Sequence, residues 1–116
     1  MFEIERDIVE QAWEKREMLQ NEDVKDAIRR IVEAVDKGVV RCAEPIDLEN
    51  SKWQVNEWVK KAIIMYFPIQ TMRTMTAGEL EWYDKMVLKR GYEELGVRVV
   101  PHAVARYGAY IAPGAI

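Results

Sequence analysis

The last eighteen residues of the chain, VVPHAVARYGAYIAPGAI (residues 99–116), repeat with a period of six. Each hexapeptide begins with an aliphatic or small residue and carries alanine in its fifth place, at Ala103, Ala109 and Ala115. A six-residue period of aliphatic, small and turn-forming residues is typical of the left-handed parallel β-helix, in which three hexapeptides form one triangular coil. These residues therefore predict the first coil of such a helix.

A single coil cannot bury its own inward-facing side chains, because solenoids need about three or more stacked repeats to be stable. The segment also lacks the polar cap that a terminal repeat requires. We therefore expect the 116 residues to be the N-terminal part of a longer protein, although the sequence gives no reason for the end at Ile116. An alanine- and glycine-rich tail with an accidental period is the alternative.

The preceding residues predict a mostly helical domain. Apolar residues at helical spacing indicate one helix over residues 2–19 and a second from Val24 to Val35, capped by Asn21 or Asp23 and ended by Gly38. The short link between them favours an antiparallel helix hairpin. A third amphipathic helix falls within residues 53–67 and ends before Pro68, with Ser51 and Asn56 as candidate caps.

Short strands and a turn complete the predicted organisation. We expect strands at residues 39–45 and 82–87, and a turn or short helix from Gly91 to Gly96. No linker separates these parts, so the predicted boundary lies at Gly96. The fold class is therefore α+β, with a helical domain over residues 1–96 and the start of a β-helix over residues 97–116.

Composition excludes several classes of function. The net charge of −3, with basic and acidic residues interleaved, disfavours a nucleic-acid partner. No run reaches the roughly 18 apolar residues that span a bilayer, so we expect no membrane partner. Cys42 is the only cysteine, which excludes an internal disulfide, favours a reduced cytoplasmic protein and predicts a packing role for this thiol. One histidine and no clustered carboxylates predict no metal site.

Several motifs resemble one family over nearly the whole chain. They are RCAEPID, WVKKAIIMYF, EWYDKMVLK and GVRVVP, in this order, followed by the hexapeptides. The sequence is similar to the N-terminal domain and first coil of tetrahydrodipicolinate N-succinyltransferases, from the diaminopimelate and lysine pathway. The resemblance implies a homotrimer that transfers succinyl from succinyl-CoA to the amine of ring-opened tetrahydrodipicolinate.

The resemblance also assigns one site residue. The arginine of the G-x-R-V-V-P motif binds the dicarboxylate substrate in the family, and here it is Arg98. A guanidinium suits this role because it grips a carboxylate through two hydrogen bonds. The resemblance places the catalytic acids and the CoA groove beyond Ile116. We therefore expect residues 1–116 to hold no catalytic residue and no cofactor, and to be inactive alone.

For the other residues of interest the sequence favours a structural position over a functional role, or assigns no role. His102 resembles the catalytic base of other hexapeptide acyltransferases, but a corner or surface position is the favoured interpretation. Arg106 is a neighbour of Arg98 without an assigned role. Lys60 and Lys61 fit a solvated helix face, and the tryptophans at 53, 58 and 82 fit core or domain contacts. The alternative function is a non-catalytic α+β interaction domain with an apolar docking tail.

Overall fold

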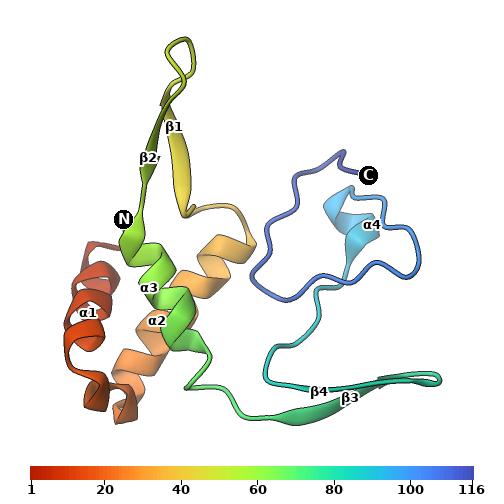
Figure 1. The fold of residues 1–116 in the computed structure, drawn as a ribbon, viewed down its shortest axis with the longest axis horizontal. Coiled ribbons are helices and arrows are strands. Elements are labelled where there is room, and N and C mark those ends of the chain that lie inside the picture. The colour runs from red at the N-terminus through yellow and green to blue at the C-terminus, as the bar shows by residue number, and fades with distance from the viewer.

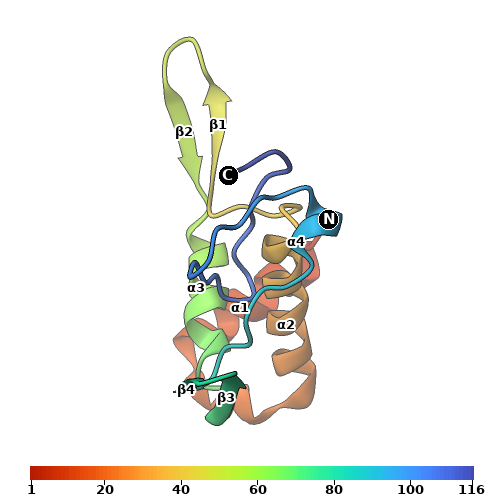
Figure 2. The ribbon, with the colours of Figure 1, turned by 90° about the vertical axis from the view of Figure 1, so that its right-hand side faces the viewer.

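The computed structural model describes residues 1–116 and contains a three-helix bundle, two β-hairpins and a C-terminal ring. The bundle consists of α1 (Glu3–Glu14), α2 (Glu22–Asp36) and α3 (Glu57–Tyr66), with the short 3-10 helix η1 (Arg16–Gln20) between the first two. Figure 1 shows the bundle on one side and the ring on the other. Figure 2 gives the view from the ring side.

The predicted helix hairpin is confirmed, with a break that the periodicity did not reveal. The helix expected over residues 2–19 ends at Glu14 and continues as η1. The second helix begins as expected, because the Asn21 side chain accepts hydrogen bonds from the backbone N–H groups of Asp23 and Val24 at 2.8 and 3.4 Å. These bonds satisfy two N–H groups that the first turn leaves unpaired.

The hydrophobic core lies between the three helices. The fully buried side chains with the largest volumes are Ile28, Ile31, Met65, Val9 and Val59. These side chains lie on the apolar stripes of the three helices, and the burial of the stripes against one another stabilises the bundle. The core is therefore made by residues 1–69 with few contributions from the rest of the chain.

The first hairpin decides between the two candidate starts of the third helix. Strand β1 (Ala43–Asp47) pairs antiparallel with β2 (Lys52–Val55), so a start at Ser51 is wrong, and α3 begins at Glu57 with Asn56, the other candidate, at its N-cap position. The strand predicted at 39–45 is shifted toward the C-terminus for the same reason. Val55, expected on the apolar stripe of the third helix, and Trp53, expected in a core or domain contact, are exposed to 66% and 58% on this hairpin.

A second hairpin precedes the ring. Strand β3 (Arg73–Ala77) pairs with β4 (Leu80–Asp84) across a two-residue turn, in which Gly78 has a φ of 60°. The sequence predicted only the second strand, at residues 82–87, and missed its partner. The turn or short helix predicted at 91–96 is confirmed as α4 (Tyr92–Leu95), flanked by Gly91 and Gly96 with φ of 79° and 71°.

The C-terminal ring comprises residues 97–116 and contains no regular strand. Turns recur at residues 101–102, 107–108 and 113–114, in the third and fourth places of every hexapeptide. The end of the segment bonds to its beginning: the N–H of Gly114 donates to the carbonyl of Gly96 at 2.7 Å, and the N–H of Arg98 donates to the carbonyl of Ala115 at 3.0 Å. The eighteen-residue repeat therefore closes once upon itself.

The fold class is α+β, as predicted, and none of its helices has the length and apolar character needed to cross a membrane. The molecule is flat, with principal extents of 43 × 42 × 20 Å. The β1–β2 hairpin projects from the bundle in both views (Figures 1 and 2).

Candidate functional site

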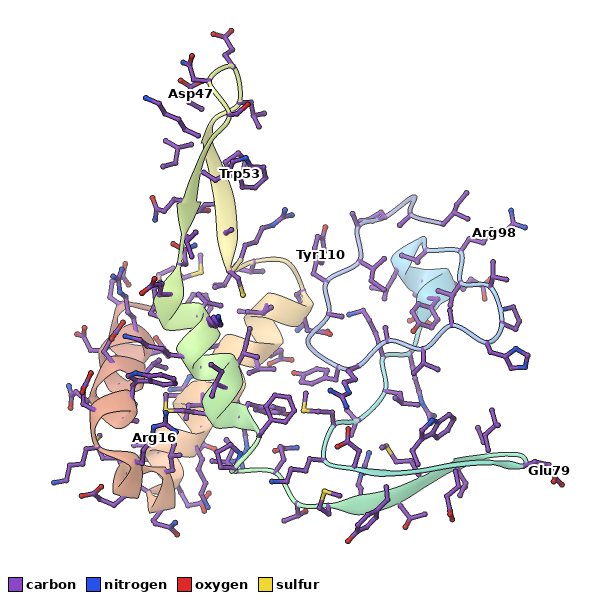
Figure 3. All side chains as sticks on the ribbon, in the orientation of Figure 1. Arg16, Asp47, Trp53, Glu79, Arg98 and Tyr110 are labelled. Carbon is purple, nitrogen blue, oxygen red and sulfur yellow. The ribbon has the colours of Figure 1, made fainter.

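Arg98 lies at the point where the ring begins and ends. Its backbone N–H is held by the carbonyl of Ala115, and its side chain is exposed without an acidic partner (Figure 3). The neighbouring Val97 is buried. The guanidinium is therefore free to bind an anion from outside this chain.

An apolar hollow opens inside the ring next to Arg98. It has a volume of about 330 Å³, and ten of its eleven lining residues are hydrophobic, including Val97, Val99 and Ile111. Several of these side chains face solvent, with Val100 and Val104 each exposed to 56%. One charged group at the rim of an apolar surface can orient an anionic ligand, while the remainder of the hollow offers only packing.

The other two residues of the ring that the sequence singled out, His102 and Arg106, differ from Arg98 in their surroundings. His102 is exposed in the first turn of the ring and makes no hydrogen bond, which agrees with the surface position expected for it. Arg106 donates to Asp84 at 2.9 Å and forms an isolated β-bridge with Leu88. Arg106 therefore ties the ring to the end of β4 and to the segment that follows it.

A buried ion pair joins the ring to the bundle. Lys89 is the only buried charged residue, and its Nζ lies 2.7 Å from the Oδ1 of Asp36 at the end of α2. The same Oδ1 accepts a hydrogen bond of 2.8 Å from the backbone N–H of Gly108 in the ring. One carboxylate thus connects three segments that are far apart in the sequence.

Aromatic contacts support this junction. The centroid of the Tyr107 phenol lies 6.5 Å from that of the Tyr66 phenol on α3. Burial, assisted by the nearby Glu33 and Asp36, raises the pKa of Tyr107 to about 12. Burial also raises the pKa of Tyr66. Burial thus favours the neutral form of both phenols, which suits packing between the C-terminal ring and the bundle.

Tyr110 makes a second aromatic contact with the bundle. The centroid of its phenol group lies 5.0 Å from the guanidinium carbon of Arg41. The Tyr110 phenol also lies so close to Gly38 that a Cβ atom added to Gly38 would lie 2.6 Å from it. Gly38, whose φ is 76°, thus serves both as the end of α2 and as the space for Tyr110.

Sequence reasoning missed this junction. Asp36, Lys89 and Gly108 have no motif in common, and only the fold brings them together. The packing role expected of Cys42 is wrong, because this residue precedes the projecting hairpin and is exposed. Lys61 differs from a free surface lysine, since its Nζ lies 2.9 Å from Glu10, which raises its pKa. No group of three or more His, Cys, Asp or Glu side chains lies close enough to hold a metal ion.

Comparisons with known proteins agree with the motifs. The family model described as "Tetrahydrodipicolinate N-succinyltransferase N-terminal" matches residues 5–69. Relatives named 2,3,4,5-tetrahydropyridine-2,6-dicarboxylate N-succinyltransferase are 43% identical in Psychrobacter arcticus and 38% identical in Coxiella burnetii, over 93% and 94% of this chain and 42% of each relative. The relative of that name from Legionella pneumophila is 37% identical over 96% of this chain and 43% of its own length.

The matched region extends from the bundle through the ring, since the curated relatives cover more than nine-tenths of the chain. The chain spans less than half the length of these relatives. The family model alone covers more than half of the chain and includes α2, α3 and all but the first two residues of α1. The chain therefore belongs to the tetrahydrodipicolinate N-succinyltransferase N-terminal family.

Proposed function

We propose that the chain is the N-terminal portion of a succinyl-CoA-dependent N-succinyltransferase that acts on tetrahydrodipicolinate in lysine and diaminopimelate biosynthesis. The observation that carries this proposal is the family match over residues 5–69, together with relatives of that printed name at 37–43% identity. Succinyl-CoA is the acyl donor in this proposal, and the enzyme works in the cytoplasm as a homotrimer.

The C-terminal ring supports a β-helix as the next structural unit. Its turns recur every six residues, and its two closing hydrogen bonds join positions about one eighteen-residue coil apart. In a parallel β-helix the same spacing links one coil to the next. We therefore assign residues 97–116 to the first coil of a left-handed β-helix, whose following coil covers the apolar hollow.

Arg98 is the substrate-binding residue of this proposal. Its exposed guanidinium has no acidic partner in the chain and stands beside an apolar hollow. A dicarboxylate would satisfy it through a bidentate pair, which a lysine cannot reproduce. Residues 1–116 carry one wall of the substrate site, and the acidic catalytic groups and the CoA groove belong to the remainder of an enzyme of the relatives' length.

The test is a kinetic comparison in an enzyme of that length. Replacing Arg98 with alanine removes a charge-assisted pair, so the KM for tetrahydrodipicolinate should rise about 10- to 100-fold while the KM for succinyl-CoA changes little. The KM of Arg98→Lys for tetrahydrodipicolinate should lie between those of the unmodified enzyme and Arg98→Ala, because lysine keeps the charge and loses the bidentate hydrogen bonding of the guanidinium. Unchanged kinetics in Arg98→Ala would exclude the assignment of Arg98.

A matched control separates binding from a general loss of charge. Arg73 is an exposed arginine of β3 that takes part in none of the ion pairs, so Arg73→Ala should leave both KM values unchanged. Absence of any succinyl transfer from succinyl-CoA by the unmodified enzyme would exclude the proposed activity itself. That result would favour the non-catalytic interaction domain.

A further inference from the structure

Three of the nine arginines carry a guanidinium that has no partner in the chain. Three others form ion pairs with carboxylates, namely Arg29, Arg30 and Arg106. A further three lie over aromatic rings, namely Arg6, Arg16 and Arg41. Arg73, Arg90 and Arg98 remain, and Arg98 is the proposed substrate contact. The charges of Arg73 and Arg90 therefore have no role in the fold or in the proposed activity.

Arg73 and Arg90 line the same cavity, here called the hairpin pocket. It has a volume of about 260 Å³ and lies between the second hairpin and the segment that follows β4; its main lining residues are Arg73, Met75, Trp82, Val87, Leu88 and Arg90. Figure 1 shows this segment leaving β4 and turning toward α4. The two arginines stand at opposite ends of this stretch of chain, and the fold brings them to one cavity.

The second hairpin supplies an apolar wall of the pocket. Its register pairs Arg73 with Asp84 and Met75 with Trp82, and alternate cross-strand pairs share a face. Met75 and Trp82 are half-buried on this face, whereas Tyr83 on the opposite face is exposed to 68%. None of the cation–π contacts covers the indole of Trp82. The indole therefore offers a flat surface to a ligand.

The hairpin pocket has no acidic group among its lining residues. The carboxylate opposite Arg73 in the strand register is Asp84, and its Oδ2 accepts a hydrogen bond of 2.9 Å from Arg106. The other carboxylates of this hairpin lie outside the lining: Glu79 and Glu81. Two uncompensated positive charges therefore line one cavity, although the net charge of the chain is −3.

We propose that the hairpin pocket binds a small dianion with a flat apolar body, either a phosphate monoester or a dicarboxylate. The two guanidiniums bind its oxygens, because arginine forms paired, charge-assisted hydrogen bonds with phosphates and with carboxylates. The flat body packs against Trp82 and Met75. The volume lies below the roughly 300–1,000 Å³ of sites for drug-sized ligands, so the body is small, about one ring.

This site is separate from the one assigned to Arg98. The hairpin pocket and the apolar hollow beside Arg98 have no lining residue in common. Figure 3 shows Arg98 well apart from Glu79, which marks the tip of the second hairpin. The proposal therefore goes beyond the succinyl transfer and stands without it, since its evidence is the pocket and its two arginines.

Calorimetric titration of the purified protein with phenyl phosphate and with benzene-1,3-dicarboxylate tests the site. At least one probe should bind, and Arg73→Gln and Arg90→Gln should each raise its Kd about 10-fold, because each removes charge-assisted hydrogen bonds. Both arginines are exposed, so circular dichroism should show an unchanged fold. Arg16→Gln is the matched control and should leave the Kd unchanged, since Arg16 lies 4.3 Å from the ring of Trp13, outside the pocket.

A second variant separates the apolar body from the charge. Trp82→Leu should raise the Kd of the aromatic probe about 3- to 10-fold and leave the Kd of inorganic phosphate unchanged, because only the aromatic body needs the indole. The NMR signal of the Trp82 indole N–H, identified by its absence in Trp82→Phe, should also shift when the probe is added to the unmodified protein. This measurement needs no variant that retains the hairpin.

The outcomes distinguish the ligand and the site. Binding of one probe alone supports the site and identifies phosphate or carboxylate as its ligand chemistry. The proposal is overturned if neither probe binds, if Arg16→Gln weakens binding as much as Arg73→Gln, or if Arg73→Gln and Arg90→Gln have no effect. Arg98→Ala should leave the Kd unchanged, and a loss of binding there would place the probe at the substrate site and overturn a second one. Failure of succinyl transfer would not bear on these results.

Discussion

The bundle and the ring bury their apolar residues to very different extents. The bundle encloses a core of fully buried aliphatic side chains, whereas Val97 is the only buried residue of the ring. Both segments are rich in aliphatic residues, so composition does not explain the difference. The bundle has three amphipathic faces that cover one another, and a single coil has no second layer.

The ring depends on its junction with the bundle for its position. Asp36, Lys89 and the aromatic contacts of Tyr107 and Tyr110 hold residues 105–110 against α2 and α3. The first part of the ring, which carries Arg98, is held by its own closing hydrogen bonds. The two regions should therefore respond differently to substitutions in the core, at the junction and in the ring.

The largest effect should come from a cavity in the bundle. Ile28 is fully buried on α2, so Ile28→Ala should lower the free energy of unfolding by about 4 kcal/mol through lost transfer energy and an unfilled cavity. Val104→Ala is the matched change in the ring, where the side chain is 56% exposed, and should cost less than about 0.5 kcal/mol. Urea unfolding measures both. Equal losses would contradict the contrast between a closed core and an open ring.

A smaller loss is expected when the junction is broken. Asp36→Ala leaves the buried Lys89 without its partner, so stability should fall by about 3 kcal/mol, near the low end for such pairs because Asp36 is 18% exposed. Adding Lys89→Met should recover most of this loss, since an apolar side chain tolerates the site. Urea unfolding of the single and double variants measures the effect. A double variant no more stable than Asp36→Ala would show that the ion pair is not its cause.

The sequence predicted the parts whose physics is local. The stripe from Val24 to Val35 and the cap at Asn21 specified α2, because helical spacing and capping act within a few residues. Residues 53–55 were placed within the third helix, because their apolar spacing fits a helical stripe while pairing with β1 makes them extended. Asn56, one of the two candidate caps, is the N-cap residue of α3. Strand pairing of this kind depends on a partner that periodicity does not reveal.

The site divides in the same way. Arg98 was found because a motif carries it, and its prediction as a substrate contact stays a prediction. The carboxylate of Asp36, which joins Lys89 and Gly108, was missed because its partners are 53 and 72 residues away. Contacts at such separations are properties of the assembled fold, and a single sequence without a motif does not signal them.

The smallest effect should appear at alkaline pH, where the junction phenol titrates. Burial raises the pKa of Tyr107 from 10.0 to about 12, with Glu33, Tyr66 and Asp36 nearby adding to the effect. Because the folded pKa is raised, its contribution to stability is fully present below pH 10 and is lost as pH rises toward 12. We expect the free energy of unfolding to fall by about 1 kcal/mol over this interval, since solvent reaches part of the Tyr107 phenol and reduces the effect. Urea unfolding from pH 9 to 12 should show a shallower decline in Tyr107→Phe than in the unmodified protein, and Tyr83→Phe, at an exposed phenol, should follow the unmodified curve. If Tyr107→Phe declined as steeply as the unmodified protein, the alkaline weak point would lie in the bundle and not at the contact that holds the ring to it.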